Sequence, residues 1–513
     1  MATITQTPAQ SKEIKIPVEA KNFINGEWRE AASGKRFSSV NPADTREIIG
    51  TAPESDERDV KEAVEAAKEA FETWSKWSWV KRAELLDNLA QLIKRDLEQM
   101  SRLVTRECGK PINEGRADVV ETLHMVQFAA SLGRMPIGQV VSSEIAEKDA
   151  YIRRKPKGVV ACITPWNFPM AIPLWEMAPS LVSGNTVVFK PSEETPICGD
   201  YLFRLMEEAG FPKGVINIVH GHGEVVGAAL VKHPDVNVVV FTGSYKVGKW
   251  VQQYAATEVH KFVATEMGGK NAVIVLDDAD MDLAVPACIL SAFKTSGQRC
   301  VSANRLIVDR KIVDKFQERF LETVDRIKIG NGLREDVFMG PLINQEGVDK
   351  YFYHNQKAIE EGAQVLREGG RLTGGEYDHG FFVKPFVYRM EYRPGTFCLR
   401  EEAFSPHVAI IPVDGIEQAI HVYNDTNYGL AMAVVTEDFR KWRLIRDRCE
   451  YGLGYVNLPS IGAEVHLPFG GVKGSGNGHP SAEGLIDAVT HRTAFTVNHA
   501  KKIQLAQGLS AEI

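Results

Sequence analysis

Apolar residues near the start of the chain recur with the spacing of helices. Between Ser55 and Trp74 they stand three or four positions apart behind a Ser-Asp cap, which predicts a helix with one apolar face. The face is formed by Val60, Ala63, Val64, Ala67, Phe71 and Trp74. A second predicted helix presents Leu85, Leu86, Leu89, Leu92, Ile93 and Leu97 on one side. Both helices are expected to pack on a core and to take no part in chemistry.

From Gly158 onward, short runs of β-branched residues alternate with stretches of helical length. Runs that are apolar at almost every position are typical of a parallel sheet covered by helices on both faces. We therefore predict an α/β fold whose sheet binds a nucleotide at the carboxyl ends of its strands. The predicted strands are Val159–Thr164, Thr186–Phe189, Val215–Val219, Val236–Phe241 and Phe262–Ala264.

A second α/β region extends from about Asn271 to His466. Its predicted strands include Arg305–Val308, Val408–Pro412 and Ala431–Val435. Two further segments, residues 139–154 and 494–498, are also strand-like. Two arrangements are open for them: they pair across a subunit interface, or they are edge strands of the main sheet.

Composition narrows the class of protein. Apolar residues make up 44% and charged residues 25% of the 513 residues, as in an ordinary globular protein. The net charge of −7 argues against a nucleic-acid binder. No apolar run approaches the ~18–20 residues of a membrane helix. The polar start does not resemble a secretory signal, so residues 1–15 are expected to form a loose tail.

The seven cysteines are scattered, and none forms a CxxC pair. This pattern predicts neither a disulfide framework nor a zinc site. It fits a reducing compartment, and we expect the protein to be cytoplasmic.

Two glycine-rich turns are candidates to hold a phosphate. Gly221–Gly227 follows the strand that ends at Val219, and Gly243–Gly248 follows the strand that ends at Phe241. Backbone N–H groups at a helix start bind phosphate, and the hydroxyl of Ser244 favours the second turn. Tight turns without any ligand explain most such patterns.

Lys190 and Glu193 stand at the carboxyl end of another predicted strand. They can grip two ribose hydroxyls or form a surface ion pair. From these residues alone, the ion pair is the favoured interpretation.

Three polar side chains are candidates for covalent chemistry. Asn167 lies between two prolines in ITPWNFP, which hold its amide rigidly, as an oxyanion site requires. Cys300 ends GQRC and Glu266 opens EMGGK. An accessible thiolate is a nucleophile, and a carboxylate is a base for water. Each also has an ordinary interpretation: a structural turn, a buried cysteine and a solvated glutamate.

Together these segments resemble the aldehyde dehydrogenase superfamily, over nearly the whole chain from FINGEW (23–28) to AFTVN (494–498). The matching segments, in the family's order, are ITPWNFP, KPSEETP, FTGSYKVG, EMGGK, GQRC, EEAFSP and PFGGVKGSGNG. The resemblance implies a Rossmann-like parallel-sheet NAD-binding domain (1–135 and 157–265), a second α/β catalytic domain (266–467) and a small β oligomerisation arm (136–156 and 485–513). It also implies a homodimer or homotetramer.

The resemblance implies a role for each matching residue. Cys300 is expected as the nucleophile, Glu266 as the base for the hydrolytic water, and Asn167, with the backbone N–H of Cys300, as the oxyanion site. The implied cofactor contacts are Trp166, Lys190, Glu193, Gly243, Ser244, Glu402 and Phe404. The residues expected beside the aldehyde are Phe168, Trp175, Arg299 and Phe469. No metal is expected.

Three segments depart from the usual family pattern. Ser405 replaces the glycine of EEIFGP, and His479-Pro480 stands where the family often has Arg-Glu, so a glutamate sometimes assigned to proton relay is absent. The loop GAE (462–464) resembles members that oxidise amino-acid or keto-acid semialdehydes.

Arg299, next to Cys300, either binds a substrate carboxylate or turns outward into a salt bridge with a helix.

The implied reaction is NAD(P)-dependent oxidation of an aldehyde, such as a carboxylate-bearing semialdehyde, to a carboxylic acid through a thiohemiacetal and a thioester on Cys300. NAD is expected to be preferred over NADP as cofactor, because the Glu193 carboxylate would repel a 2′-phosphate. The alternatives are an acylating dehydrogenase that passes the thioester to coenzyme A, a structural protein that kept the fold, and a plain cofactor-binding module. Glu266 argues against the first, and intact Cys300 and Asn167 argue against the second.

Overall fold

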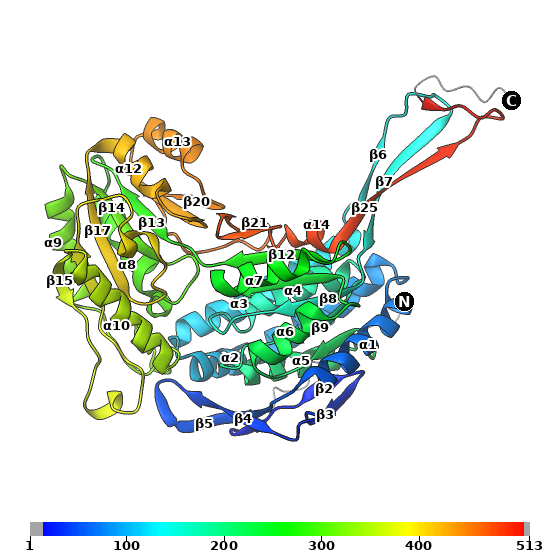
Figure 1. Ribbon diagram of the computed structural model, residues 1–513, viewed down its shortest axis with the longest axis horizontal. Coiled ribbons are helices and arrows are strands. Elements are labelled where there is room, and N and C mark those ends of the chain that lie inside the picture. The colour runs from blue at the N-terminus through cyan, green and yellow to red at the C-terminus, as the bar shows by residue number, and fades with distance from the viewer. Residues whose placement is uncertain (1–13, 507–513) are drawn as a thin grey trace.

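The computed structural model describes residues 14–506, and two large β-sheets dominate it. The two sheets lie in neighbouring bodies, and a three-stranded sheet projects from the first body as a long arm (Figure 1). The predicted α/β class is confirmed. The predicted loose tail, residues 1–15, lies almost entirely outside the described part of the chain.

The first sheet has eight strands in the order β23-β12-β11-β8-β9-β10-β2-β3. Its five parallel strands are the five predicted ones: β8 (Val159–Ile163), β9 (Thr186–Lys190), β10 (Ile216–Ile218), β11 (Val238–Gly243) and β12 (Phe262–Met267). Antiparallel strands complete its edges: β2 (Asn22–Ile24), β3 (Glu27–Arg29) and β23 (Gly476–Asn477). Strand order reverses between β8 and β11, and parallel sheets bind ligands at such a point.

Helices cover both faces of this sheet because successive strand residues point to opposite sides. In β8, Val160 and Cys162 join one core, whereas Val159 and Ala161 join another. The helices of this body are α1 (Glu57–Trp74), α2 (Trp79–Cys108), α3 (Ile112–Ser131), α4 (Ala171–Val182), α5 (Pro196–Glu208), α6 (Ala228–Lys232) and α7 (Tyr245–Ala255). The two helices predicted from apolar spacing are α1 and α2, and Asp56 caps the start of α1.

The second sheet has the order β15-β16-β17-β14-β13-β19-β20 and is parallel except for β15. Its strands are β13 (Asn271–Val275), β14 (Ala303–Asp309), β15 (Gln364–Glu368), β16 (Phe386–Arg389), β17 (His407–Val413), β19 (Ala431–Val435) and β20 (Leu453–Val456). Its helices are α8 (Met281–Phe293), α9 (Val313–Val324), α10 (Gln345–Glu360), α11 (Phe397–Arg400), α12 (Gly415–Asn424) and α13 (Phe439–Arg448). The three strands predicted in this region are β14, β17 and β19.

The remaining strands form smaller sheets, in the orders β1-β5-β4, β18-β22 and β21-β24, and one further helix precedes the arm strand β25. These elements are β1 (Val18–Glu19), β4 (Arg36–Asn41), β5 (Asp44–Pro53), β18 (Tyr428–Gly429), β21 (Pro468–Phe469), β22 (Val472–Lys473), β24 (Ser481–Ala482) and α14 (Leu485–Val489). Within residues 14–506, no helix is both long and apolar enough to cross a membrane.

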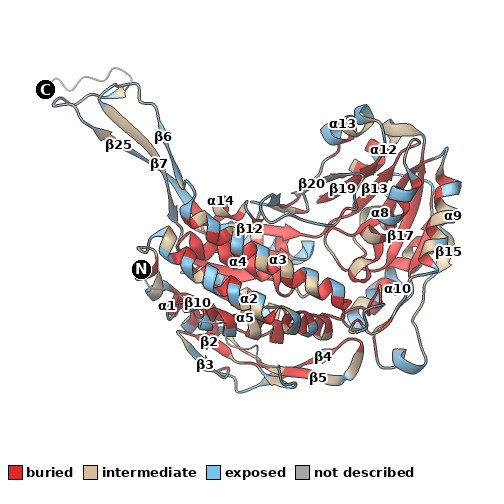
Figure 2. Ribbon diagram, turned by 180° about the vertical axis from the view of Figure 1, so that it is seen from behind, coloured by how far each residue is buried: buried red, intermediate tan, exposed pale blue. Residues whose placement is uncertain are grey.

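The two strand-like segments form the arm, so the expectation that they are edge strands of the main sheet is wrong, whereas pairing across a subunit interface stays a prediction. The arm consists of β6 (Gly138–Val141), β7 (Lys148–Pro156) and β25 (Thr490–Asn498) in the order β25-β7-β6. β25 pairs with β7 along its whole length inside one chain, because α14 returns the chain to the point where β7 leaves the body. Figure 2 shows the large sheets mostly buried and the arm largely exposed.

A buried ion pair connects α2 and α3 to the start of α4. Lys110 Nζ lies 2.9 Å from Asp118 Oδ2, and both side chains are fully buried. Asp118 Oδ1 accepts a hydrogen bond of 2.8 Å from the backbone N–H of Ala171. The pair therefore supports the loop that precedes α4 and carries Asn167.

Lys110→Met should lower the free energy of unfolding by about 3–5 kcal/mol because it leaves Asp118 buried without its partner. Equilibrium unfolding in urea measures this change. The matched control is Lys61→Met, since the Lys61 and Glu65 side chains of the α1 pair are 68% and 56% exposed; its stability should stay nearly constant. Equal stability of both variants would contradict the assigned role of the Lys110–Asp118 pair.

Candidate active site

Cys300 lies in a tightly held loop between α8 and β14. Six of the seven cysteines are buried, and Cys300 alone is partly exposed. The loop begins with three left-handed residues, Thr295, Ser296 and Gly297, whose φ angles are 53°, 56° and 72°. Asn271 of β13 donates its side-chain N–H to the carbonyl of Cys300 at 2.6 Å. Cys300 is therefore the one cysteine that is not fully buried, and the backbone that carries it is fixed.

Asn167 lies in the loop after β8 and reaches the same cysteine loop. Its side chain is buried, and Nδ2 donates to the carbonyl of Gln298 at 3.1 Å. An amide nitrogen has two hydrogens, so one remains for a reacting group. The structure thus brings Asn167 together with the loop of Cys300, as an oxyanion site requires.

Glu266 lies on β12 without a hydrogen-bond partner for either carboxylate oxygen within residues 14–506. Burial raises its pKa well above the usual value. Burial also raises the pKa of the Cys300 thiol, and the charges of Glu266 and Glu402 raise it further. Glu266 therefore acts on the ionisation of Cys300, and burial disfavours the charged form of both groups.

The predicted ribose contacts form a close pair at the end of β9. Lys190 Nζ lies 2.7 Å from Glu193 Oε2, and the lysine is almost completely buried. Burial alone would raise the pKa of Glu193, but the charge and hydrogen bond of Lys190 hold it below its usual value. The backbone N–H of Gly223 acts in the same direction, which places the first glycine turn beside Glu193.

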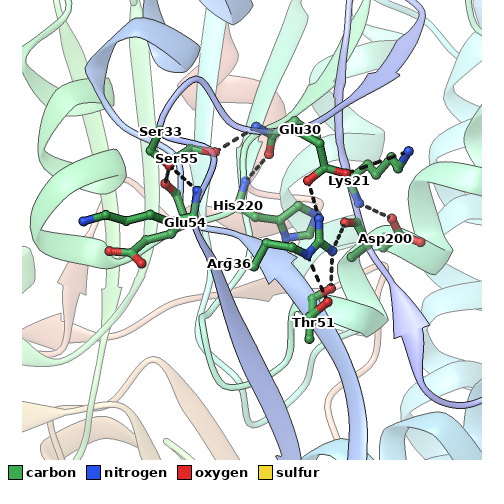
Figure 3. A network of polar contacts seen from close by, with 12 residues as sticks. Lys21, Glu30, Ser33, Arg36, Thr51, Glu54, Ser55, Asp200 and His220 are labelled. Atoms are coloured by element: carbon green, nitrogen blue, oxygen red, sulfur yellow. Dashed lines mark hydrogen bonds and ion pairs between the residues drawn. The ribbon is translucent and has the colours of Figure 1, made fainter.

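A neutral histidine lies under this pair. His220 follows β10, and neither ring nitrogen has a hydrogen-bond partner within the described residues. Burial lowers its pKa to about 3, and the charges of Lys190 and Arg36 contribute. Figure 3 shows His220 within the polar network of the first strands, where the Ser55 N–H donates to its carbonyl at 3.3 Å.

The second glycine turn lies at the start of α7. Gly243 ends β11, and Ser244 caps the helix by accepting the N–H of Val247 at 3.4 Å. The next two residues, Tyr245 and Lys246, are exposed. This helix start therefore presents free backbone N–H groups to an anion.

The EEAFSP loop lies against the residues that precede Cys300. Glu402 accepts the N–H of Gly269 at 2.9 Å, and burial raises its pKa to about 7. Phe404 has a φ of 48° and packs edge-on against Trp166, with ring centroids 5.8 Å apart. A Cβ on Gly297 would lie 2.3 Å from the carbonyl oxygen of Ser405, so the two loops touch through their backbones.

The residues predicted beside the aldehyde form two contacting groups. Trp175 and Phe469 have ring centroids 4.6 Å apart. The Phe168 ring lies between two cations, with Lys110 Nζ at 4.0 Å and the Arg299 guanidinium carbon at 4.9 Å from its centroid. No group of His, Cys, Asp or Glu arranged to hold a metal occurs in residues 14–506.

Arg299 turns toward α3. Its Nη2 donates to Glu114 Oε2 at 2.7 Å, and its Nε donates to Thr295 Oγ1 at 2.8 Å. Nη1 has no acceptor among residues 14–506, and 11% of the side chain is exposed. Both contacts correspond to the salt-bridge alternative, while one edge of the guanidinium stays unused.

Two residues near Cys300 were missed by the sequence analysis. Glu121 of α3 is half-buried, and burial, followed by the charge of Asp118, raises its pKa to about 8. Burial raises the pKa of Tyr455 on β20 to about 12, with contributions from Cys300 and Glu121. The sequence did hold a signal, because Glu114, Asp118 and Glu121 stand four and three positions apart, on one face of a helix.

Several known proteins are similar to this chain in sequence and in fold. Residues 28–495 match the model of the aldehyde dehydrogenase family. The chain is 40% identical over 456 residues to an alpha-ketoglutaric semialdehyde dehydrogenase of Bacillus subtilis (strain 168), covering 88% of this chain and 93% of the relative. It is 37% identical to a betaine aldehyde dehydrogenase of the same organism, covering 89% and 93%.

A malonate-semialdehyde dehydrogenase of Lacticaseibacillus casei is 35% identical, with 94% of this chain and 97% of the relative covered. Among solved structures, a betaine aldehyde dehydrogenase variant of Staphylococcus aureus in complex with NAD+ superposes with a TM-score of 0.91. It is 33% identical, and the match covers 96% of this chain and 99% of that one. The chain belongs to the aldehyde dehydrogenase family.

Proposed function

We propose that this chain oxidises a carboxylate-bearing aldehyde to the carboxylic acid, with Cys300 as nucleophile and NAD as cofactor. The observation that carries the proposal is the convergence of two groups on the one partly exposed cysteine: a rigid amide, Asn167, and the carboxyl of Glu266, whose oxygens have no hydrogen-bond partner within residues 14–506. The oxidation of an aldehyde is the activity of the family.

The chemistry of the donor set fits a dinucleotide. Lys190 and Glu193 would hold the adenosine ribose, and Gly243 and Ser244 would present the α7 start to the pyrophosphate. Glu402 would hold the nicotinamide ribose, with the rings of Phe404 and Trp166 beside it. When bound, NAD supplies the acceptor for the hydride that leaves the substrate.

The first half of the reaction forms a bond to Cys300. Burial disfavours the thiolate at rest, so sulfur releases its proton to solvent water as it adds to the carbonyl carbon. The oxygen becomes an oxyanion, and the free N–H of Asn167 and the backbone N–H of Cys300 would donate to it. Loss of hydride from this thiohemiacetal leaves a thioester on Cys300.

The second half releases the acid. Glu266 would accept a proton from water as the water oxygen adds to the thioester carbon. The C–S bond then breaks, and the proton on Glu266 passes to the leaving Cys300 sulfur, which restores both groups. A raised pKa makes the ionised carboxylate a stronger base than an exposed one, and no side-chain donor competes for its oxygens. The presence of Glu266 favours hydrolysis over transfer to coenzyme A.

Arg299 and the relatives support the substrate class. The guanidinium carbon of Arg299 lies 4.9 Å from the centroid of the Phe168 ring, and Nη1 has no acceptor within the described residues. The two bonds from Nε and Nη2 hold the guanidinium in advance of binding. Two of the three relatives named above act on semialdehydes by their names, and the GAE loop is similar to such members.

The exposed arm bears on how copies of the chain assemble, and the free cysteines bear on the compartment of the protein. The outer strand of the arm exposes Val140 (78%), and Phe495 on the opposite outer strand is 57% exposed, which supports contact with a second copy in a homodimer or homotetramer. All seven cysteines are free, which supports a reducing compartment such as the cytoplasm. The division into an NAD-binding domain, a catalytic domain and an oligomerisation arm is part of the same proposal.

Glu266→Gln should keep the first turnover and slow the following ones, because the amide cannot accept a proton from water. Stopped-flow absorbance should show a burst of NADH, about one per active site, and then slow release. The control Cys300→Ala should show neither burst nor turnover, with NAD binding preserved. Slowing of the burst itself in Glu266→Gln would place this residue in thiol activation instead of hydrolysis.

NAD should give a higher kcat/KM than NADP, since the Glu193 carboxylate repels a 2′-phosphate. Glu193→Gln should lower the NAD-to-NADP ratio of kcat/KM by on the order of tenfold, because it removes the negative charge that repels the 2′-phosphate. The neighbouring Glu194, which accepts from Asn344 at 2.7 Å, provides the control Glu194→Gln, in which the ratio should not change. A wild-type preference for NADP refutes this assignment.

Arg299→Ala should cost a semialdehyde about 2–3 kcal/mol more in kcat/KM than an uncharged aldehyde of equal length, the scale of a charged hydrogen bond. Any loss of kcat/KM that comes from a disturbed cysteine loop affects both substrates equally, so it cancels when the two are compared. Equal losses for both would show that Arg299 supports the cysteine loop without contacting the substrate.

A further inference from the structure

The turn before Cys300 is held in a conformation that its residues do not favour. Thr295 and Ser296 both have positive φ angles, and Thr295 is β-branched. Such residues rarely adopt the left-handed region, and they stay there only where surrounding contacts fix them. The contacts that fix this turn therefore control where Cys300 lies.

Glu114 supplies the densest set of these contacts. Its Oε1 accepts the backbone N–H of Thr295 at 3.1 Å, and its Oε2 accepts the Thr295 hydroxyl at 2.5 Å. The same Oε2 accepts Nη2 of Arg299 at 2.7 Å, and Lys294 Nζ lies 3.8 Å from Oε1. One carboxylate on α3 thus contacts residues on both sides of the strained turn.

We infer that Glu114 is a positioning residue that sets the geometry of Cys300 and of its oxyanion site. The carbonyl that orients Asn167 belongs to Gln298, and the backbone N–H proposed for the oxyanion belongs to Cys300. Gln298 lies within the segment that Glu114 anchors at Thr295 and Arg299, and Cys300 directly follows this segment. The inference rests on the proposed role of Cys300 and adds a residue that none of the family motifs contains.

The carboxylate is charged in its resting state. Burial alone would raise the pKa of Glu114, but the charges of Arg299 and Lys294 and the hydrogen bonds from Thr295 and Arg299 outweigh it and lower the pKa. An uncharged amide in place of this carboxylate would put its own NH2 donor among the N–H and O–H donors of Lys294, Thr295 and Arg299. Glu114→Gln therefore removes the anchor with almost no change in volume.

The test measures the rate of the NADH burst in Glu114→Gln and the alkylation rate of Cys300 by iodoacetamide, followed by peptide mass spectrometry. We expect the burst to slow by roughly 30–100-fold, the effect of a misplaced reacting group, with a changed alkylation rate and KM for NAD nearly constant. Thr295→Val removes the hydroxyl, with its hydrogen bonds to Glu114 and from Arg299 Nε, but keeps the backbone N–H bond to Glu114, so it should slow the burst less and in the same direction. This second variant keeps the test decisive if Glu114→Gln does not fold.

Glu107→Gln is the matched control. Glu107 is also completely buried, but it accepts the N–H groups of Ile197 and Cys198 at the start of α5. This variant should lose stability and keep the wild-type burst rate. Wild-type burst rates in folded Glu114→Gln and Thr295→Val overturn the inference, whereas full activity of Cys300→Ala overturns the proposed function itself.

Discussion

The active site depends on one backbone constraint, the fixed loop from Thr295 to Cys300. Its left-handed start is unfavourable for the residues that form it, so the loop must be held from outside. The contacts that hold it include those of β13 through Asn271, the loop after β8 through Asn167, and α3 through Glu114. These side chains belong to both bodies of the molecule, and the meeting of the two bodies is therefore what creates the site.

Low polarity is the second condition for the chemistry. Burial raises the pKa of both Cys300 and Glu266, so neither group is a strong base or nucleophile at rest. Proton movement must then accompany binding and bond formation. The same low polarity strengthens the hydrogen bonds proposed for the oxyanion, because water does not compete for the donors.

The central strands of both sheets are predictable from sequence because a buried parallel strand is apolar at almost every position. The pairing of the arm is not predictable in this way, since a strand edge is satisfied equally by its own chain, by the main sheet or by a second copy. α14 decides the outcome by returning the chain beside β7.

In the candidate site, too, some residues are predictable from the sequence and others become visible only in the fold. Local motifs identify Cys300, Glu266 and Asn167, but the partner of Arg299 lies on α3, 185 positions earlier in the chain. No spacing rule connects two residues so far apart. The acidic face of α3 was visible in the sequence, yet only the fold shows that Glu114 points to the cysteine loop.

The central claim is that substrate becomes covalently attached to Cys300 and leaves by hydrolysis at Glu266. Mass spectrometry of Glu266→Gln, mixed with aldehyde and NAD and then quenched in acid, tests it directly. The account predicts a mass increase equal to the acyl group, located on the peptide that contains Cys300. An active enzyme without this adduct, or an adduct on another residue, would contradict it.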